Sequence, residues 1–265
     1  MRIALGLLLT VTAWSGPIQP TRPVQLFNGR DLSGFYTWLR THKYDDPEHV
    51  FSVVNGMIRV SGGEWGGLTT KEEYRDYRLI VEWKWGGPNV GERTGKARDS
   101  GVLIHGSGPD GAGNSGSWLE SYESQIIEGG TGDIILVSQT AGLSLTADVR
   151  TGTDKQLYWQ RGGTPTRRDR GRINWWARDV NWQDALGFRG AVNVENAVGA
   201  WNRTEVICQG DRLTNKLNGK VMTEAYGLNR SAGKIQIQSE GAEIWIRKVE
   251  LRPLPTRSAS PQGRP

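Results

Sequence analysis

The sequence predicts an all-β protein of the sandwich or barrel type. Short segments with alternating apolar and polar residues recur along the chain, and glycine-rich turns separate them. No long segment shows the period of an amphipathic helix. The clearest hairpin joins 51–54 to 57–60 through Asn55-Gly56, because Asn-Gly readily adopts the positive φ angles of a two-residue turn. A second hairpin of this kind is expected at Asn218-Gly219.

The other strands follow from the same pattern. Residues 77–85 alternate regularly and predict a central strand. Shorter strands are expected at 24–27, 66–70, 133–138, 143–149, 201–208, 213–217, 220–225, 234–238 and 243–251. In the last of these the apolar phase changes after Ile246, which predicts a bulge near Arg247-Lys248. Residues 151–200 show little periodicity, so we expect a long insertion or rim loop, in which interleaved Arg and Trp side chains could form a substrate wall.

The richest set of chemically useful residues lies between Asp99 and Val137. Two strands, 101–105 and 119–127, flank a long glycine-rich loop, and such loops inside a compact domain are usually functional or disordered. A period of two places Glu123 and Gln125 on one face of the second strand, about 7 Å apart. This arrangement favours acid–base chemistry, and the alternative is a solvated polar face.

Both ends of the chain are expected to lie outside the domain, which we place at 24–251. Residues 1–15 have the features of a secretory signal peptide, with an apolar run after Arg2 that is too short to span a bilayer. They predict a secreted or periplasmic protein without a membrane span. The Pro- and Ser-rich segment 252–265 is expected to be a disordered tail.

Charge and cysteine content narrow the function classes. Four of the charges that make up the net charge of +5 are arginines in the two ends, which contain no acid, and removing them leaves +1. The basic character is therefore no indication of nucleic-acid binding. Cys208 is the only cysteine, so no intrachain disulfide can form, and its strand position predicts a small core residue. The twelve tryptophans favour stacking on sugar rings, although most Trp residues are core residues.

Seven segments, in this order, resemble one known family. They are LFNGRDLSGF, VVNGMIRV, GLTTKEEYRDYRLIVEWKW, DSGVLIHG, YESQIIEGGTGD, WNRTEVICQGDRLTNKLNG and AEIWIRKVELRPL. Together they resemble the 3-keto-disaccharide hydrolase domain family over nearly the whole of 24–251. The resemblance implies a concanavalin-like jelly-roll sandwich of two antiparallel sheets with long rim loops and the site on a concave sheet. The regions 106–118 and 151–200 look elaborated relative to the family.

The resemblance also implies a secreted enzyme that cleaves oligosaccharides or glycosides already oxidised to a ketone at C3. An upstream sugar 3-dehydrogenase would make the ketone. A base removes the acidified C2 proton, the enolate expels the C1 group, and water adds later. The candidate catalytic residues are Glu123 as base, His105 as acid or enolate stabiliser, Gln125 to orient the sugar, and Arg203 to hold the oxyanion. The candidate substrate-binding residues are Trp118, Glu128, Asp133 and Glu205.

A divalent metal is the one cofactor for which the sequence offers ligands. His105, Glu123 and Gln125 would converge if they lie on adjacent strands, and mixed nitrogen and oxygen ligands suit Mn or Zn. No HxH or HExxH pair accompanies them. The sequence therefore implies no definite cofactor.

Two other functions stay open. The segment from Glu123 to Glu128 has the pattern E-x-Q-x-x-E and is similar to the E-x-D-x-x-E motif of laminarinase-type hydrolases, apart from Gln in place of Asp. An ordinary glycoside hydrolase would use the two glutamates about 5–5.5 Å apart, provided that a bulge turns Glu128 to the face of Glu123. A lectin-like carbohydrate-binding module is the third candidate, since jelly rolls host both enzymes and binders.

Overall fold

The computed structural model describes residues 16–140 and 142–255, which form two large antiparallel sheets and one small sheet. In order of pairing, the first sheet contains β17 (Lys220–Ala225), β16 (Arg212–Leu217), β15 (Asn202–Gln209), β7 (Tyr77–Trp85), β19 (Ile244–Pro253), β4 (Met57–Val60) and β3 (Phe51–Val54), with β1 (Val24–Gln25) beside β19. The second sheet contains β14 (Gly171–Ile173), β10 (Ile134–Val137), β9 (Glu120–Ile127), β8 (Asp99–Ser107), β18 (Ala232–Ser239), β5 (Gly66–Thr70) and β2 (Phe35–Leu39), with β6 (Tyr74–Arg75) beside β18. The small sheet contains β12 (Leu157–Trp159), β11 (Leu145–Thr151) and β13 (Thr164–Arg168).

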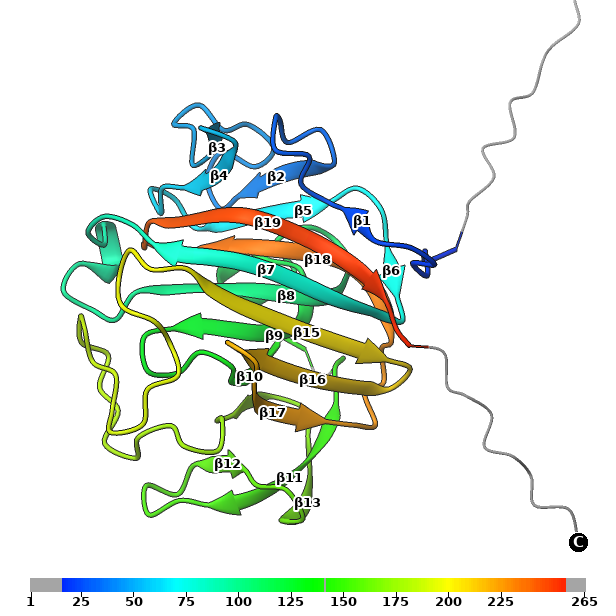
Figure 1. Cartoon of the computed structure of the whole chain (residues 1–265), viewed down its shortest axis with the longest axis vertical. Helices are drawn as coiled ribbons and strands as arrows, with labels where there is room; N and C mark the ends of the chain where they lie inside the picture. Colours follow the sequence, from blue (N-terminus) through cyan, green and yellow to red (C-terminus); the bar gives the residue numbers. More distant parts are fainter. Residues whose placement is uncertain (1–15, 141, 256–265) are drawn as a thin grey trace, which may run out of the picture.

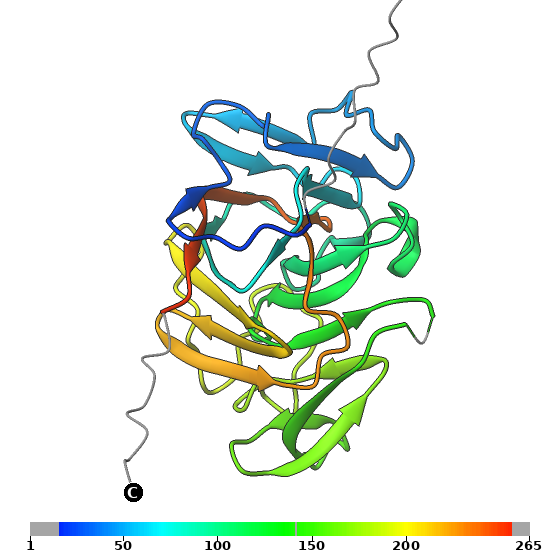
Figure 2. The ribbon, with the colours of Figure 1, turned by 90° about the vertical axis from the view of Figure 1, so that its right-hand side faces the viewer.

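The two large sheets pack face to face as a sandwich. Figure 1 shows β7, β15 and β19 of the first sheet in front of β8, β9 and β18 of the second, and Figure 2 shows the same two layers from the side. The only helical elements in the described residues are the short turns η1 (Gly91–Arg93) and η2 (Asn114–Gly116). This architecture confirms the predicted all-β jelly-roll sandwich. No helix in the described ranges has the length and apolar character needed to cross a membrane.

The hydrophobic core lies between the two sheets. From the second sheet, alternate residues of β8 and β9 point into it, namely Val102, Ile104, Tyr122 and Ile126. From the first sheet, β7 contributes Tyr77, Leu79, Val81, Trp83 and Trp85. Because side chains alternate along a strand, the residues between the core positions of β8 and β9 lie on the outer face of the second sheet. This outer face carries the candidate site.

The two tight hairpins and the bulge, which depend on neighbouring residues, agree with the prediction. Asn55 and Gly56 have φ angles of 50° and 74°, and Asn218 and Gly219 have φ angles of 48° and 84°, so both tight hairpins are confirmed. The pairing of β19 with β7 shifts register between Ile246 and Lys248, which confirms the bulge.

Two expectations were wrong in part. The segment 151–200 holds three strands, β12 to β14, which are too short and too exposed to show a period. The strand β19 continues to Pro253, so its last two residues belong to the sheet and not to the expected tail. The predicted signal peptide (1–15) and the rest of that tail from residue 256 onward lie outside the described residues.

Candidate active site

The strand register assembles the site from parts of the chain that are far apart. One row across the outer face of the second sheet runs through Gln236, Leu103, Glu123, Ile135 and Arg172, on β18, β8, β9, β10 and β14 in turn. The next row contains Gly101 of β8 opposite Gln125 of β9. Glu123 and Gln125 therefore share one face, next to β8 on one side and β10 on the other.

Glu123 lies almost wholly buried above a glycine. Only 4% of this residue is exposed. A Cβ atom on Gly101 would come within 2.5 Å of Glu123 Oε1 and would lie 2.5 Å from Gln238 Oε1, so the missing side chain leaves the space that these two groups occupy. Among the described residues, Glu123 Oε1 and both polar side-chain atoms of Gln238 have no hydrogen-bond partner. Buried polar groups are normally paired, so these free atoms indicate a functional site.

Electrostatics favour a carboxyl that gains and loses a proton near neutral pH. Burial and the nearby carboxyl of Asp99 together raise the pKa of Glu123 to about 8, although the Arg172 guanidinium acts in the opposite direction. Perturbed carboxyl pKa values of this kind are concentrated at catalytic sites. Glu123 can thus serve as a proton acceptor with a useful driving force.

Two more carboxyls lie beside Glu123. Asp99 is buried, accepts a hydrogen bond from Gln125 Nε2 (3.2 Å) and lies 3.5 Å from Arg93 Nη1. Burial raises the pKa of Asp99 to about 7. Glu240 directly follows β18, and burial together with the charges of Asp99 and Glu123 raises its pKa well above the ordinary value. A site with three such carboxyls can hold at least one of them protonated at neutral pH.

A largely buried apolar cluster adjoins the acidic residues. Trp118 stacks on Trp65 with ring centroids 5.5 Å apart, and it packs in a small cluster with Leu103 and Ile135. Leu103 and Ile135 are the cross-strand neighbours of Glu123, so the cluster lies directly beside the carboxylate. Trp118 is buried, with only 4% exposed, and Trp65, which stacks on it, is partly exposed. Trp65 is therefore the indole of this pair that a sugar ring could contact.

The structure does not bring His105 to this site. Strict alternation would put His105 on the face of Leu103, but its φ angle is +53° and the pairing of β8 with β9 shifts register between Ile104 and Ser107. This irregularity turns the side chain to the other side of the sheet.

On that side His105 is a buried residue of the core. Its Nδ1 donates to the backbone oxygen of Arg230 (3.0 Å), and its ring lies edge-on to Tyr77 and Tyr122. Burial lowers the pKa of His105 to about 4, so the ring is neutral at physiological pH. His105, Glu123 and Gln125 therefore do not converge as a ligand set. In the part of the chain that the structure describes, no three or more His, Cys, Asp or Glu side chains are placed to hold a metal ion.

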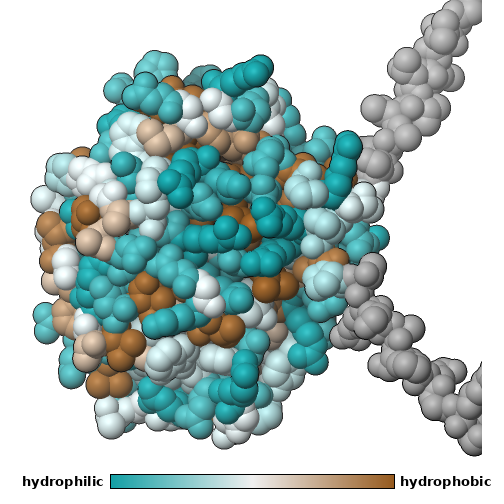
Figure 3. All heavy atoms as spheres, viewed as in Figure 1, coloured by the Kyte–Doolittle hydropathy of each residue, from teal (hydrophilic) through white to brown (hydrophobic). Residues whose placement is uncertain are grey.

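Arg203 and Glu205 are also remote from Glu123. They lie on β15, on the outer face of the first sheet, where Glu205 Oε2 accepts from Arg78 Nε (2.6 Å) and Arg203 Nη1 lies 3.5 Å from Glu82 Oε1. This face points toward the viewer in Figures 1 and 3 and is largely hydrophilic. The two sheets and the core separate these residues from the candidate site, because Arg203 is adjacent along β15 to core-facing Thr204.

Glu128 and Asp133 flank the turn between β9 and β10, and each carboxylate forms an ion pair with an arginine. Glu128 is wholly buried, lies 2.7 Å from Arg98 Nη1 and accepts from the backbone N–H of Gly187 (2.8 Å). The pairing of β9 with β8 is regular from Tyr122 to Ile127, so no bulge turns Glu128 toward Glu123. Asp133 pairs with Arg178 and accepts from the backbone N–H of Trp175 (2.7 Å). Both carboxylates anchor the segment after β14 to the sheet.

The sequence pattern missed several members of the site. Gln238 and Glu240 lie far along the chain from Glu123, and only the pairing of β18 with β8 brings them near. Arg172 lies in a three-residue strand within the segment that showed no period. Asp99 is the first residue of the segment from Asp99 to Val137. Its alternation with Gly101 along the strand is the one local pattern that could have identified it as a site residue.

A jelly-roll sandwich with buried carboxyls beside stacked tryptophans is the arrangement of a carbohydrate-active enzyme or carbohydrate-binding module. The chain belongs to the 3-keto-α-glucoside-1,2-lyase-like domain family, whose model matches residues 22–252. The family suggested by the sequence motifs is thereby confirmed. No curated protein sequence matches the chain.

Solved structures are similar to the chain at low sequence identity. One, described as a "putative glycosyl hydrolase" from Parabacteroides distasonis, is 17% identical, with a TM-score of 0.52 over 88% of this chain and 94% of that chain. A β-glucanase of Bacillus licheniformis is 13% identical, with a TM-score of 0.45 over 87% of this chain and 97% of the other. At 17% identity, the likeness to the first of these structures concerns the fold alone.

Proposed function

We propose that this protein is an enzyme that cleaves 3-keto-glycosides by removing the proton at C2 and expelling the group at C1. One observation carries the proposal: in a chain of the 3-keto-α-glucoside-1,2-lyase-like family, Glu123 presents a buried carboxyl oxygen without a hydrogen-bond partner among the described residues. The raised pKa of Glu123, about 8, suits a base that must take a carbon-bound proton.

The first step forms an enolate. A ketone at C3 acidifies the C2 proton, which the ionised Glu123 accepts, and the electron pair moves into the ketone to give an enolate. The negative charge that develops on the enolate oxygen is stabilised by the positive charge of Arg172, which also acts on Glu123, and by that of Arg93 beside Asp99. Arg172 thus takes the part that the sequence had suggested for Arg203.

The second step expels the leaving group. The enolate reforms the ketone, the C1–O bond breaks, and the departing oxygen needs a proton. Glu240 and Asp99 are the candidate donors, because burial raises the pKa of both. Water then adds across the C1=C2 double bond: its oxygen bonds to C1, Glu123 returns its proton to C2, and the second proton of the water restores the donor, which completes a net hydrolysis. Trp65, which is partly exposed and stacks on the buried Trp118, offers an apolar contact for the sugar ring.

The proposed function also implies a cellular compartment for the enzyme and a preceding enzyme that makes its substrate. The apolar run after Arg2 is typical of a signal peptide, so the enzyme would act in the periplasm or outside the cell. Because the substrate must already carry a ketone, a sugar 3-dehydrogenase must act before it. N-terminal sequencing of the protein from its own cell, beginning at or near Gly16, would test the export.

The decisive experiment compares methyl 3-keto-α-glucoside with methyl α-glucoside, with and without deuterium at C2. Wild-type protein, Glu123→Gln and the control Glu73→Gln, which changes an exposed glutamate, are assayed for released methanol. We expect cleavage of the keto sugar alone, a slower rate for the C2-deuterated form, and a loss of at least about 10²-fold in Glu123→Gln only.

Each other outcome selects a different function. Cleavage of the plain glucoside would favour an ordinary glycoside hydrolase. Binding of both sugars without turnover would favour a carbohydrate-binding module. Keto-specific cleavage that survives in Glu123→Gln would retain the reaction and refute the assignment of the base.

A further inference from the structure

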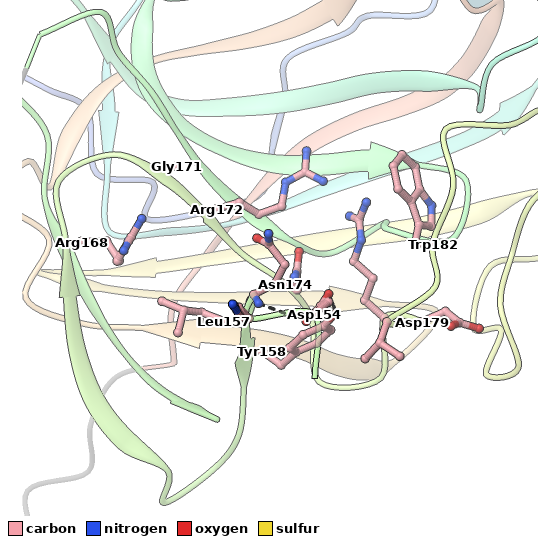
Figure 4. A pocket seen from close by; sticks show the side chains of 13 residues that line it. Asp154, Leu157, Tyr158, Arg168, Gly171, Arg172, Asn174, Asp179 and Trp182 are labelled. Atoms are coloured by element: carbon pink, nitrogen blue, oxygen red, sulfur yellow. Dashed lines mark hydrogen bonds between the residues drawn. The ribbon is translucent and has the colours of Figure 1, made fainter. Parts of the chain in front are cut away.

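A polar pocket adjoins the candidate active site at the edge of the second sheet. It has a volume of about 580 Å³ and lies between β12, β14 and the segment that follows β14. Figure 4 shows Arg172 and Trp182 at one side of the pocket and Asp154 and Tyr158 at the other. The cleavage chemistry proposed above uses only Arg172 from this pocket.

The pocket carries an excess of positive charge. Four cationic side chains line it, and two carboxylates accompany them; the cations are Lys155, Arg168, Arg172 and Arg178, and the acids are Asp154 and Asp179. Both acids already accept hydrogen bonds from their own segments: Asp154 from Tyr158 Oη (2.5 Å) and Asp179 from the backbone N–H of Asn181 (2.9 Å).

Two of the four cations have no acidic partner. Arg178 and Arg172 share the buried Asp133, which lies behind the pocket, and Arg172 is 3.5 Å from it. Within the described ranges, neither Lys155 nor Arg168 lies within ion-pair distance of a carboxylate. Among the residues that the structure describes, the Arg168 side chain donates only to the backbone oxygen of Arg170 (3.3 Å). The pocket therefore holds cationic groups that are free to pair with an incoming anion.

The strand register connects this pocket to the reacting centre. Arg172 lies in the same row as Glu123 and two strands away, which is about 10 Å across the sheet. A sugar chain bound with one ring at Glu123 and extending toward the β14 edge would bring its next ring to the pocket. Trp182 lies under the Arg178 guanidinium at 4.2 Å, which holds both side chains in place at the pocket wall.

We propose that this arginine pocket (Lys155, Arg168, Arg172 and Arg178) binds the anionic group of an acidic sugar residue next to the sugar that reacts. The group is a singly charged oxyanion, the carboxylate of a uronic acid or a sulfate ester, since guanidinium groups pair with both. The inference deepens the proposed function, because it makes acidic glycans the substrate class of the same site.

The test measures binding by calorimetry, without turnover. The probes are three disaccharides of one linkage that end in glucuronic acid, in sulfated glucose or in plain glucose. The proteins are the wild type, the double variant Lys155→Gln/Arg168→Gln, and Arg30→Gln as the control. Arg30 is an exposed arginine in the loop between β1 and β2. Figure 1 shows β2 at the other end of the molecule from β12.

We expect wild-type protein to bind at least one acidic probe roughly tenfold or more tightly than the neutral one, because a charge-assisted hydrogen bond contributes that much. The preference should fall with added salt, vanish in the double variant and persist in Arg30→Gln. Which acidic probe is preferred identifies the anion. The comparison of probes on the wild type does not depend on how the variants fold.

Equal affinity for acidic and neutral probes, or no measurable binding of either acidic probe, overturns the pocket assignment. A preference that survives in the double variant also overturns it. An acidic preference without cleavage of any keto sugar would retain the pocket and refute the proposed reaction. Cleavage of keto sugars with equal binding of all probes would retain the proposed reaction and refute the pocket assignment.

Discussion

Gly101→Ala should inactivate the enzyme while leaving it folded. The new Cβ would come within 2.5 Å of Glu123 Oε1 and Gln238 Oε1, whereas ordinary contact begins at 3.4 Å, so the carboxylate must move by about 1 Å. No positive φ is required at Gly101, and the crowded atoms are the far ends of flexible side chains, so the backbone tolerates the change. A misplacement of about 1 Å in a reacting group lowers the rate on the order of 10²-fold.

The assay is steady-state cleavage of a 3-keto-glucoside, with thermal unfolding measured on the same preparations. We expect kcat to fall by about 10²-fold. Gly63→Ala is the matched control, because a Cβ there meets only Ser61 Oγ at 3.4 Å and Gly63 has no positive φ.

The position of the carboxylate, and not overall stability, must explain the loss. Wild-type activity in Gly101→Ala would refute the assignment of Glu123 as a precisely held base. A drop in melting temperature large enough to unfold the protein under assay conditions would show that crowding acts on the fold instead.

Three further predictions follow from the placement of charged groups. The value of kcat/KM should rise as the pH approaches about 8, because Glu123 must be ionised to accept a proton, and should fall again at higher pH, where the proton donor, Asp99 or Glu240, loses its proton; a pH–rate profile from 5 to 10 measures both limbs. Arg98→Ala should lower the free energy of unfolding by about 3–5 kcal/mol in urea, because it leaves the wholly buried Glu128 without its closest cation. Arg203→Ala should change kcat/KM by less than about twofold and stability by less than about 1 kcal/mol, because its ion pairs lie at the surface of the other sheet.

Features encoded by neighbouring residues could be predicted from the sequence. The Asn-Gly hairpins and the bulge in β19 depend on local backbone preferences and on a local change of phase. The placement of Glu123 and Gln125 on one face needed only an unbroken period of two along β9, and the pairing with β8 is regular there. The same rule failed for His105, because a single left-handed residue reverses the direction of a side chain.

Features that depend on long-range pairing could not be predicted. Arg203 and Glu205 alternate along β15 as well as Glu123 and Gln125 do along β9, and nothing in either pattern says which sheet a strand joins or which face is the site. Gln238 and Glu240 reach the site through β18, whose partner β8 is more than a hundred residues earlier. The arginine pocket depends on β12 and β14, which are three residues each and carry no recognisable period.

The burial that makes Glu123 a useful base must also lower the stability of the fold. The folded protein raises the pKa of Glu123 from 4.5 to about 8, so between these values the folded state binds more protons than the unfolded state. The free energy of unfolding therefore falls as pH rises through this window and is lowest, for this group, above pH 8. Glu123→Gln removes the ionisable group, so it should stabilise the protein by about 2–4 kcal/mol at pH 8.5 and by much less at pH 5. Urea unfolding of the wild type, Glu123→Gln and Glu73→Gln at both pH values measures the difference. A Glu123→Gln variant no more stable than wild type at pH 8.5 would mean that the carboxylate is solvated or paired in the folded state, and the proposed base would lose its driving force.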